Sequence, residues 1–105
     1  MKKMLSQEAR YSLEKMSKVD IFSGDHLMVG LNCLEEGQSQ SVHTHAGSEK
    51  FYVVLQGCAR FVVGEQTLDA EKGEIVLCPA GVPHGIERAL QRTLILVGIA
   101  PPPKK

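Results

Sequence analysis

The stretch that decides the fold is Gly73-Glu-Ile-Val-Leu-Cys-Pro79-Ala-Gly81-Val-Pro83-His84. Its apolar and β-branched residues from Ile75 to Cys78 predict a short strand. A tight turn follows, because the two prolines fix φ and Gly81 is free to adopt a positive φ. This turn aims His84 from the start of a second strand, so the histidine needs partners from elsewhere in the chain.

A second polar stretch lies upstream, Gly37-Gln-Ser-Gln-Ser-Val-His43-Thr-His45-Ala-Gly-Ser-Glu49-Lys-Phe-Tyr-Val-Val-Leu-Gln-Gly57. Side chains alternate between two faces of an extended segment, so His43 and His45 point to the same side. Neutral imidazoles are favoured ligands of several transition metals. We therefore predict a metal site on His43, His45 and His84, with or without the carboxylate of Glu49. The alternative is that each histidine is simply solvated or packed.

The rest of the chain contains short strand-like runs that end at glycine or proline turns. No run has a sustained helical period, which favours an all-β sandwich or barrel. The runs are about eight in number: Lys18–Phe22, His26–Leu34, Lys50–Gln56, Ala59–Val63, Gln66–Asp69, Ile75–Cys78, His84–Arg88 and Arg92–Ile99. We divide the chain into an N-terminal arm (1–17, a short helix or irregular), a single β-barrel domain (18–100) and a proline-lysine tail (101–105).

Size and composition limit the class of protein. A chain of 105 residues has room for one hydrophobic core, and no apolar run reaches the roughly 18 residues of a membrane helix. With a formal net charge of +0 and 5% aromatic residues, we expect neither nucleic acid nor a membrane as partner. The N-terminus lacks the apolar segment of a secretory signal, and the three cysteines have no paired spacing, so we expect a cytoplasmic protein.

Taken together, the two stretches resemble the paired signature motifs of the cupin superfamily. The second motif matches at every glycine, proline and histidine, and the first matches at its histidines and at Gly37. The short spacing between the motifs resembles that of small single-domain microbial cupins. The resemblance implies a jelly roll and a homodimer. It also implies an interior divalent metal (Zn, Ni, Fe, Mn or Cu) on His43, His45, His84 and Glu49.

One departure concerns the carboxylate of the first motif. Counted back from Gly57, the usual glutamate position is occupied by Lys50, and Glu49 lies one residue early, on the opposite face of the strand. Either a β-bulge before Phe51 returns Glu49 to the interior, or Lys50 points inward. In the second case the site is a three-histidine centre or an anion site, and Lys50 and Tyr52 are candidates for contact with a substrate.

The fold alone does not choose an activity, so three hypotheses remain. The first is a metal-dependent enzyme on a small oxygenated substrate, oxygenase-like ahead of isomerase-like, with the metal as a Lewis acid or redox centre. The second is a non-catalytic domain that binds metal or a small molecule. The third is a structural or regulatory cupin without metal, suggested by Lys50. The first two predict a small polar ligand at open coordination positions.

Overall fold

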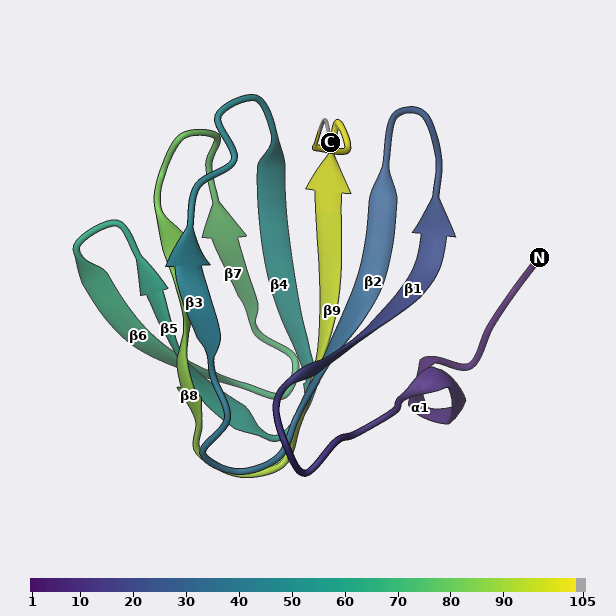
Figure 1. Ribbon diagram of the computed structural model, residues 1–105, viewed down its shortest axis with the longest axis vertical. Coiled ribbons are helices and arrows are strands. Elements are labelled where there is room, and N and C mark those ends of the chain that lie inside the picture. The colour runs from purple at the N-terminus through teal and green to yellow at the C-terminus, as the bar shows by residue number, and fades with distance from the viewer. Residues whose placement is uncertain (104–105) are drawn as a thin grey trace.

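The computed structural model describes residues 1–103, which form one short helix and nine strands (Figure 1). The helix is α1 (Leu5–Glu8). The strands are β1 (Ser17–Ser23), β2 (Met28–Leu34), β3 (Gln40–His43), β4 (Glu49–Gln56), β5 (Cys58–Val63), β6 (Gln66–Glu71), β7 (Ile75–Cys78), β8 (His84–Ala89) and β9 (Thr93–Ala100). The predicted all-β class is confirmed, with one strand more than the sequence indicated.

The additional strand is β3, which carries the first of the paired histidines. It pairs with β8 at Gln40↔Ile86 and His43↔His84, and the register is irregular between these two pairs. Its sequence, Gln-Ser-Val-His, is mostly polar and has little intrinsic preference for a strand. Pairing with β8, which no local pattern reveals, is what makes this segment a strand.

Two antiparallel sheets face each other in a sandwich. The five-stranded sheet has the order β1-β2-β9-β4-β7 and the four-stranded sheet has the order β3-β8-β5-β6 (Figure 1). Alternate residues of each strand point between the sheets; on β4 these are Lys50, Tyr52 and Val54. Their neighbours in the core are mostly aliphatic, together with Phe61. Burial of apolar surface between the sheets is the main stabilising term of such a sandwich.

The turn between β4 and β5 depends on a glycine. Gly57 has φ +88°, and a Cβ at this position would collide with the carbonyl oxygen of Arg92. Only glycine tolerates both the positive φ and the close approach. The turn therefore fixes where β4 ends, and hence which of its side chains face the interior.

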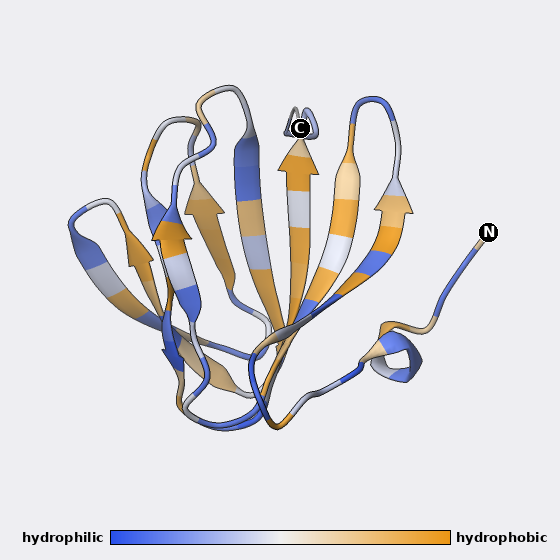
Figure 2. Cartoon of the chain, viewed as in Figure 1, coloured by the Kyte–Doolittle hydropathy of each residue, from blue (hydrophilic) through white to orange (hydrophobic). Residues whose placement is uncertain are grey.

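The N-terminal arm packs on the outer face of the five-stranded sheet. Leu5, Ala9 and Tyr11 contact a second apolar cluster around Leu31 and Leu94. Apolar residues dominate β9 and β2, whereas β4 begins with a hydrophilic stretch (Figure 2). Within residues 1–103, no helix has the length and apolar character that crossing a membrane requires.

Candidate metal centre

Strand pairing brings the two histidine motifs together. His43 on β3 and His84 on β8 are direct cross-strand partners, and the centroids of their rings lie 4.5 Å apart. Opposite residues of an antiparallel pair project to the same face of the sheet. Both imidazoles therefore point between the two sheets, where His84 is only 1% exposed.

A backbone hydrogen bond fixes the third histidine. His45 lies in the loop after β3, and its carbonyl oxygen accepts a hydrogen bond of 3.0 Å from the N–H of Gly81. Gly81 has φ +80°, as expected for the turn that precedes His84. The ring of His45 lies 4.8 Å from that of His43 and 5.5 Å from that of His84, between centroids. The turn of the second motif thus holds the loop of the first.

The three histidines form a cluster that could hold a metal ion. One ring nitrogen from each of His43, His45 and His84 lies within 4.8 Å of the others. In tetrahedral coordination two nitrogens bound to one zinc at about 2.1 Å lie about 3.4 Å apart, so a common ion needs the ring nitrogens to close by up to about 1.4 Å. The histidine side chains must rotate to supply this movement.

Hydrogen bonds at the outer ring nitrogens select the tautomers. His43 Nδ1 lies 2.9 Å from the carbonyl oxygen of Ser41, and His84 Nδ1 lies 3.0 Å from that of Val82. A carbonyl oxygen only accepts, so in the neutral rings Nδ1 carries the proton and Nε2 carries the lone pair. A backbone carbonyl in this position is the usual partner of a metal-binding histidine.

The surroundings also favour neutral rings. Burial lowers the pKa of His43, His45 and His84 below the ordinary value of 6.5. Within residues 1–103, the buried Nε2 of His84 has no hydrogen-bond partner. An unpaired buried acceptor is unfavourable unless water or an ion satisfies it. The donor set therefore fits a divalent transition metal.

The expected carboxylate ligand is not brought to this cluster. Glu49 is exposed, and β4 pairs with β9 without a bulge from Glu49 to Val54. Strand alternation therefore puts the next residue, Lys50, inside, where it is 5% exposed. Of the two arrangements that the sequence allowed, the structure has Lys50 facing the interior, and the cluster contains three histidines without Glu49.

Lys50 lies directly against the histidines. Its Nζ is 3.3 Å from His43 Nε2 and 4.6 Å from the centroid of the Tyr52 ring. Burial lowers the pKa of Lys50 to about 8, so the amine is still mostly protonated at neutral pH. The ammonium therefore donates to the lone pair of His43 that a metal would use.

Tyr52, the other candidate for contact with a substrate, is fully buried in the core. Its hydroxyl donates a hydrogen bond of 2.6 Å to Oε1 of Gln40. Burial raises the pKa of this phenol above its ordinary value of 10.0, so it stays protonated. Tyr52 thus holds the amide of Gln40 in place beneath the histidines.

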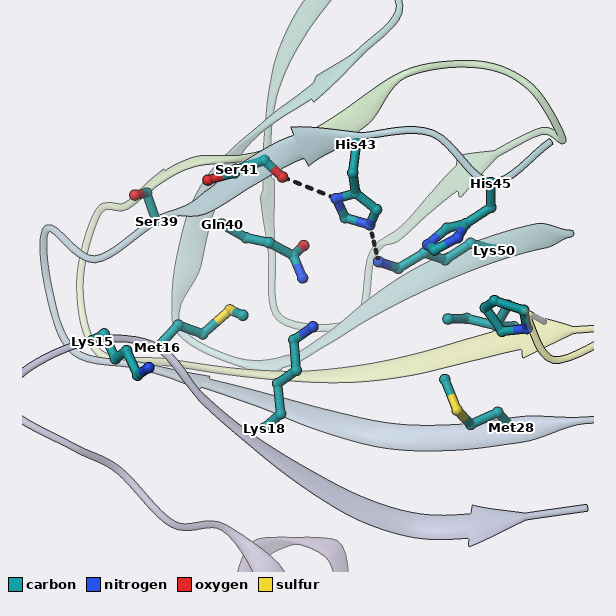
Figure 3. Close-up of a pocket in the computed structure, with 12 residues that line it drawn as sticks. Lys15, Met16, Lys18, Met28, Ser39, Gln40, Ser41, His43, His45 and Lys50 are labelled. Carbon is teal, nitrogen blue, oxygen red and sulfur yellow. Dashed lines mark hydrogen bonds between the residues drawn. The ribbon is translucent and has the colours of Figure 1, made fainter. Parts of the chain in front are cut away.

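Sequence reasoning missed two residues that line the cavity beside the histidines, Gln40 and Lys18 (Figure 3). Simple alternation counted from His43 places Gln40 on the opposite face, but the irregular register between these two residues of β3 returns it to the interior. Lys18 comes from β1, and only closure of the sandwich brings it near. A basic residue near the start of a strand is common, so the sequence did not distinguish Lys18 as a candidate site residue.

A profile described as "Cupin domain" matches residues 30–97 of the chain. An uncharacterized protein of Streptomyces coelicolor, SCO3923, is 35% identical over 77 residues, which are 73% of this chain and 72% of that protein.

Solved structures agree with these matches. TT1209 from Thermus thermophilus is 40% identical, with a TM-score of 0.91, and the match covers 96% of this chain and 97% of that one. An RmlC-like cupin protein from Desulfovibrio desulfuricans is 30% identical, with a TM-score of 0.87, over 97% of this chain and 98% of that one. KdgF from Halomonas sp. is 16% identical, with a TM-score of 0.83 over 94% of this chain and 91% of that one, and shows a common fold alone.

Proposed function

This chain belongs to the cupin domain family, and on that premise we propose that it is a small metalloprotein. His43, His45 and His84 hold one divalent transition metal, and the remaining coordination positions receive a small polar ligand. The observation that carries the proposal is the cluster itself, three imidazole nitrogens within 4.8 Å of one another. Backbone carbonyls at Nδ1 orient the rings of His43 and His84 so that each Nε2 carries the lone pair. That of His84 has no hydrogen-bond partner within residues 1–103.

The ligand set is compatible with zinc, nickel, iron, manganese or copper, since imidazole serves all of them. A bound ion would supply Lewis acidity and, if it is a redox metal, a site for O₂. The small polar ligand would bind in a cavity of about 440 Å³ beside the cluster, which His43 and His45 line. This volume is within the usual range for small-molecule sites.

A second candidate is a cupin that binds its small molecule without metal. One contact favours it, the 3.3 Å between Lys50 Nζ and His43 Nε2. The lone pair of His43 can bind the ammonium or a metal, but not both. A dication is also repelled by an ammonium beside it. Metal binding therefore requires Lys50 to leave His43.

Elemental analysis separates the two candidates. The protein is purified without chelator or nickel resin, and metal content is compared among the parent, His43→Ala and His84→Ala. The matched control is His26→Ala, because His26 is exposed and is not in the cluster. We expect about one metal per chain in the parent and the control and little in the other two variants. Equal metal content in all four would reject the metal site. Oxygen uptake by the iron- or copper-loaded parent tests for an oxygenase.

We further propose that two copies pair through the outer face of the five-stranded sheet near β7. Ile75 and Leu77 are 54% and 64% exposed, and they are the cross-strand partners of Val53 and Phe51. An exposed apolar patch of this kind is typical of an interface. Leu77→Glu should turn a dimer into a monomer in light scattering, whereas Thr67→Glu, at an exposed position of β6, should not. Monomeric parent protein would contradict the pairing.

A cytoplasmic location fits the cysteines. Cys33, Cys58 and Cys78 are all free thiols, and free thiols persist in a reducing compartment. Fractionation of cells that express the chain from its own gene tests the location.

A further inference from the structure

The cavity beside the histidines has basic walls. Three lysines line it, Lys15, Lys18 and Lys50, together with His43 and His45. No aspartate or glutamate is among the described residues that line it. Figure 3 shows Lys18 with its amine directed into the cavity from β1, across from His43 and Gln40. The cavity therefore concentrates positive charge, and no carboxylate of the described residues lines it.

Lys50 is the buried part of this charge. It is 5% exposed, and it takes part in none of the ion pairs formed within residues 1–103. Its polar neighbour is the uncharged acceptor His43 Nε2. A buried ammonium without a carboxylate is unfavourable, and proteins usually pair such a charge. Among residues 1–103, no side chain supplies this counter-ion.

The uncharged polar groups of the walls also present donors. Oε1 of Gln40 accepts from the Tyr52 hydroxyl, so the free group of this amide is its NH₂. A smaller adjoining recess of about 70 Å³ shares Lys18, Gln40 and Lys50 with the cavity and reaches Asn32. Asn32 is 4% exposed, and within residues 1–103 its Nδ2 has no acceptor. A ligand that brings acceptor oxygens would satisfy these donors.

One carboxylate opposes this charge. Asp20 of β1 lines the smaller recess but not the main cavity. No hydrogen-bonded ion pair joins it to Lys18 or Lys50 within the described part of the chain. Asp20 therefore lowers the positive potential at one edge and leaves the lysines available.

We propose that this cavity binds a small organic carboxylate, with Lys50 and Lys18 as its counter-ions and the amides of Gln40 and Asn32 as further donors. The inference rests on the proposed function for the identity of the ligand cavity, but the lysines require no metal. A carboxylate fits better than a phosphate group, because the lining has neither an arginine fork nor a helix N-terminus, the features that favour phosphate.

The test is calorimetric titration of the 105-residue protein at low salt, where charge pairing is least screened. Acetate, malonate and succinate are compared with succinamide, the neutral counterpart of succinate, and with inorganic phosphate. We expect saturable binding of at least one carboxylate and none of succinamide. Lys50→Met should weaken that binding about tenfold or more, as loss of a charged hydrogen bond does. Lys18→Met should weaken it less.

Two further variants keep the test decisive. Asp20→Asn removes the opposing charge and should tighten carboxylate binding severalfold. Lys72→Met removes an exposed lysine outside the cavity and should leave binding unchanged. Absence of binding by all three carboxylates, equal binding of succinamide, tighter binding of phosphate, or equal affinity in Lys50→Met would each overturn the inference.

Running the titration after chelator treatment and again with one equivalent of zinc separates this inference from the metal site. Binding that depends on zinc and is the same in Lys50→Met would place the anion on the metal, which overturns the inference and supports the metalloprotein. Binding that depends on Lys50 in protein that takes up no zinc would support the inference and reject the metalloprotein.

Discussion

The two sides of the site, the histidine cluster and the lysine wall of the cavity beside it, favour opposite charges. The cluster consists of the imidazoles of His43, His84 and His45, from β3, β8 and the loop after β3, whose lone pairs attract a cation. From the five-stranded sheet come the ammonium groups of Lys18 and Lys50, which repel one. The two sides meet where Lys50 Nζ lies 3.3 Å from His43 Nε2. The comparison teaches that a count of histidines is not enough to predict metal affinity, because the ammonium groups opposite would oppose a bound cation.

The largest effect is expected from removal of a histidine that would bind the metal. Free zinc at about 1,000 times its dissociation constant should raise the free energy of unfolding by about 4 kcal/mol, since it binds the folded state. His84→Ala should lose most of this gain, whereas His26→Ala should keep it. Urea denaturation in zinc and in chelator measures the difference. An equal gain in His84→Ala would mean that zinc binds elsewhere.

The basic wall can be tested by pH. The pKa of Lys50 falls from 10.5 in the unfolded chain to about 8 in the folded protein. Between these values the unfolded chain holds more protons, so stability rises with pH through this window, by at most about 3 kcal/mol at 1.36 kcal/mol per pKa unit. Below the folded pKa the burial penalty is present in full. Lys50→Met lacks this penalty and should be more stable than the parent at pH 7.

The measurement is urea denaturation of chelator-treated parent and Lys50→Met from pH 7 to 10. The advantage of the variant should shrink as pH rises, and groups such as Tyr52 that titrate in both proteins cancel in the difference. A constant difference over this range would contradict a buried ammonium.

Reversing the charge of residue 50 tests whether this position acts directly on zinc affinity. Lys50→Glu removes the repulsion and supplies a carboxylate oxygen, which is a good ligand for zinc. We expect zinc affinity to rise about tenfold, or about 1.4 kcal/mol, above that of Lys50→Met. Competition with a chromophoric chelator measures it, and Lys72→Glu controls for a change in net charge. Equal affinity in Lys50→Glu and Lys50→Met would show that this position does not reach the metal.

The smallest expected effect concerns the hydrogen bond between Tyr52 and Gln40. Tyr52→Phe deletes the hydrogen bond to Gln40 and should lower the free energy of unfolding by about 1 kcal/mol. It should change zinc affinity little, because the hydroxyl is bonded to Gln40 rather than to a histidine. Val54→Ala is a contrasting core variant that lowers stability without touching Gln40. A large loss of zinc affinity in Tyr52→Phe would assign the tyrosine to the metal site.

Local signals predicted much of the fold. Glycine and proline mark the turns, and β-branched runs mark most of the strands. The interior face of β4 follows from counting back from Gly57, which puts Lys50 and Tyr52 on one side. The choice between Lys50 and Glu49 stayed open only because a bulge is not visible in the sequence, and β4 has none there.

The candidate site was less predictable on its basic side. The histidines have a recognisable spacing, but Gln40 is inward through an irregular register, and Lys18 through closure of the sandwich. Neither effect has a local sequence signal. The contact of Lys50 with His43 likewise depends on how the two sheets approach, which is set by packing across the whole core.

The pairing of His43 with His84 has a consequence for the order of folding and metal loading. β3 and β8 are far apart in the chain, and non-local strand pairs form late, after loop closure has been overcome. We therefore expect the three-histidine set to assemble only after most of the sandwich has formed. We expect zinc to leave the refolding rate unchanged and to slow unfolding, as a ligand of the finished fold does. Stopped-flow refolding that accelerates with zinc would contradict this order.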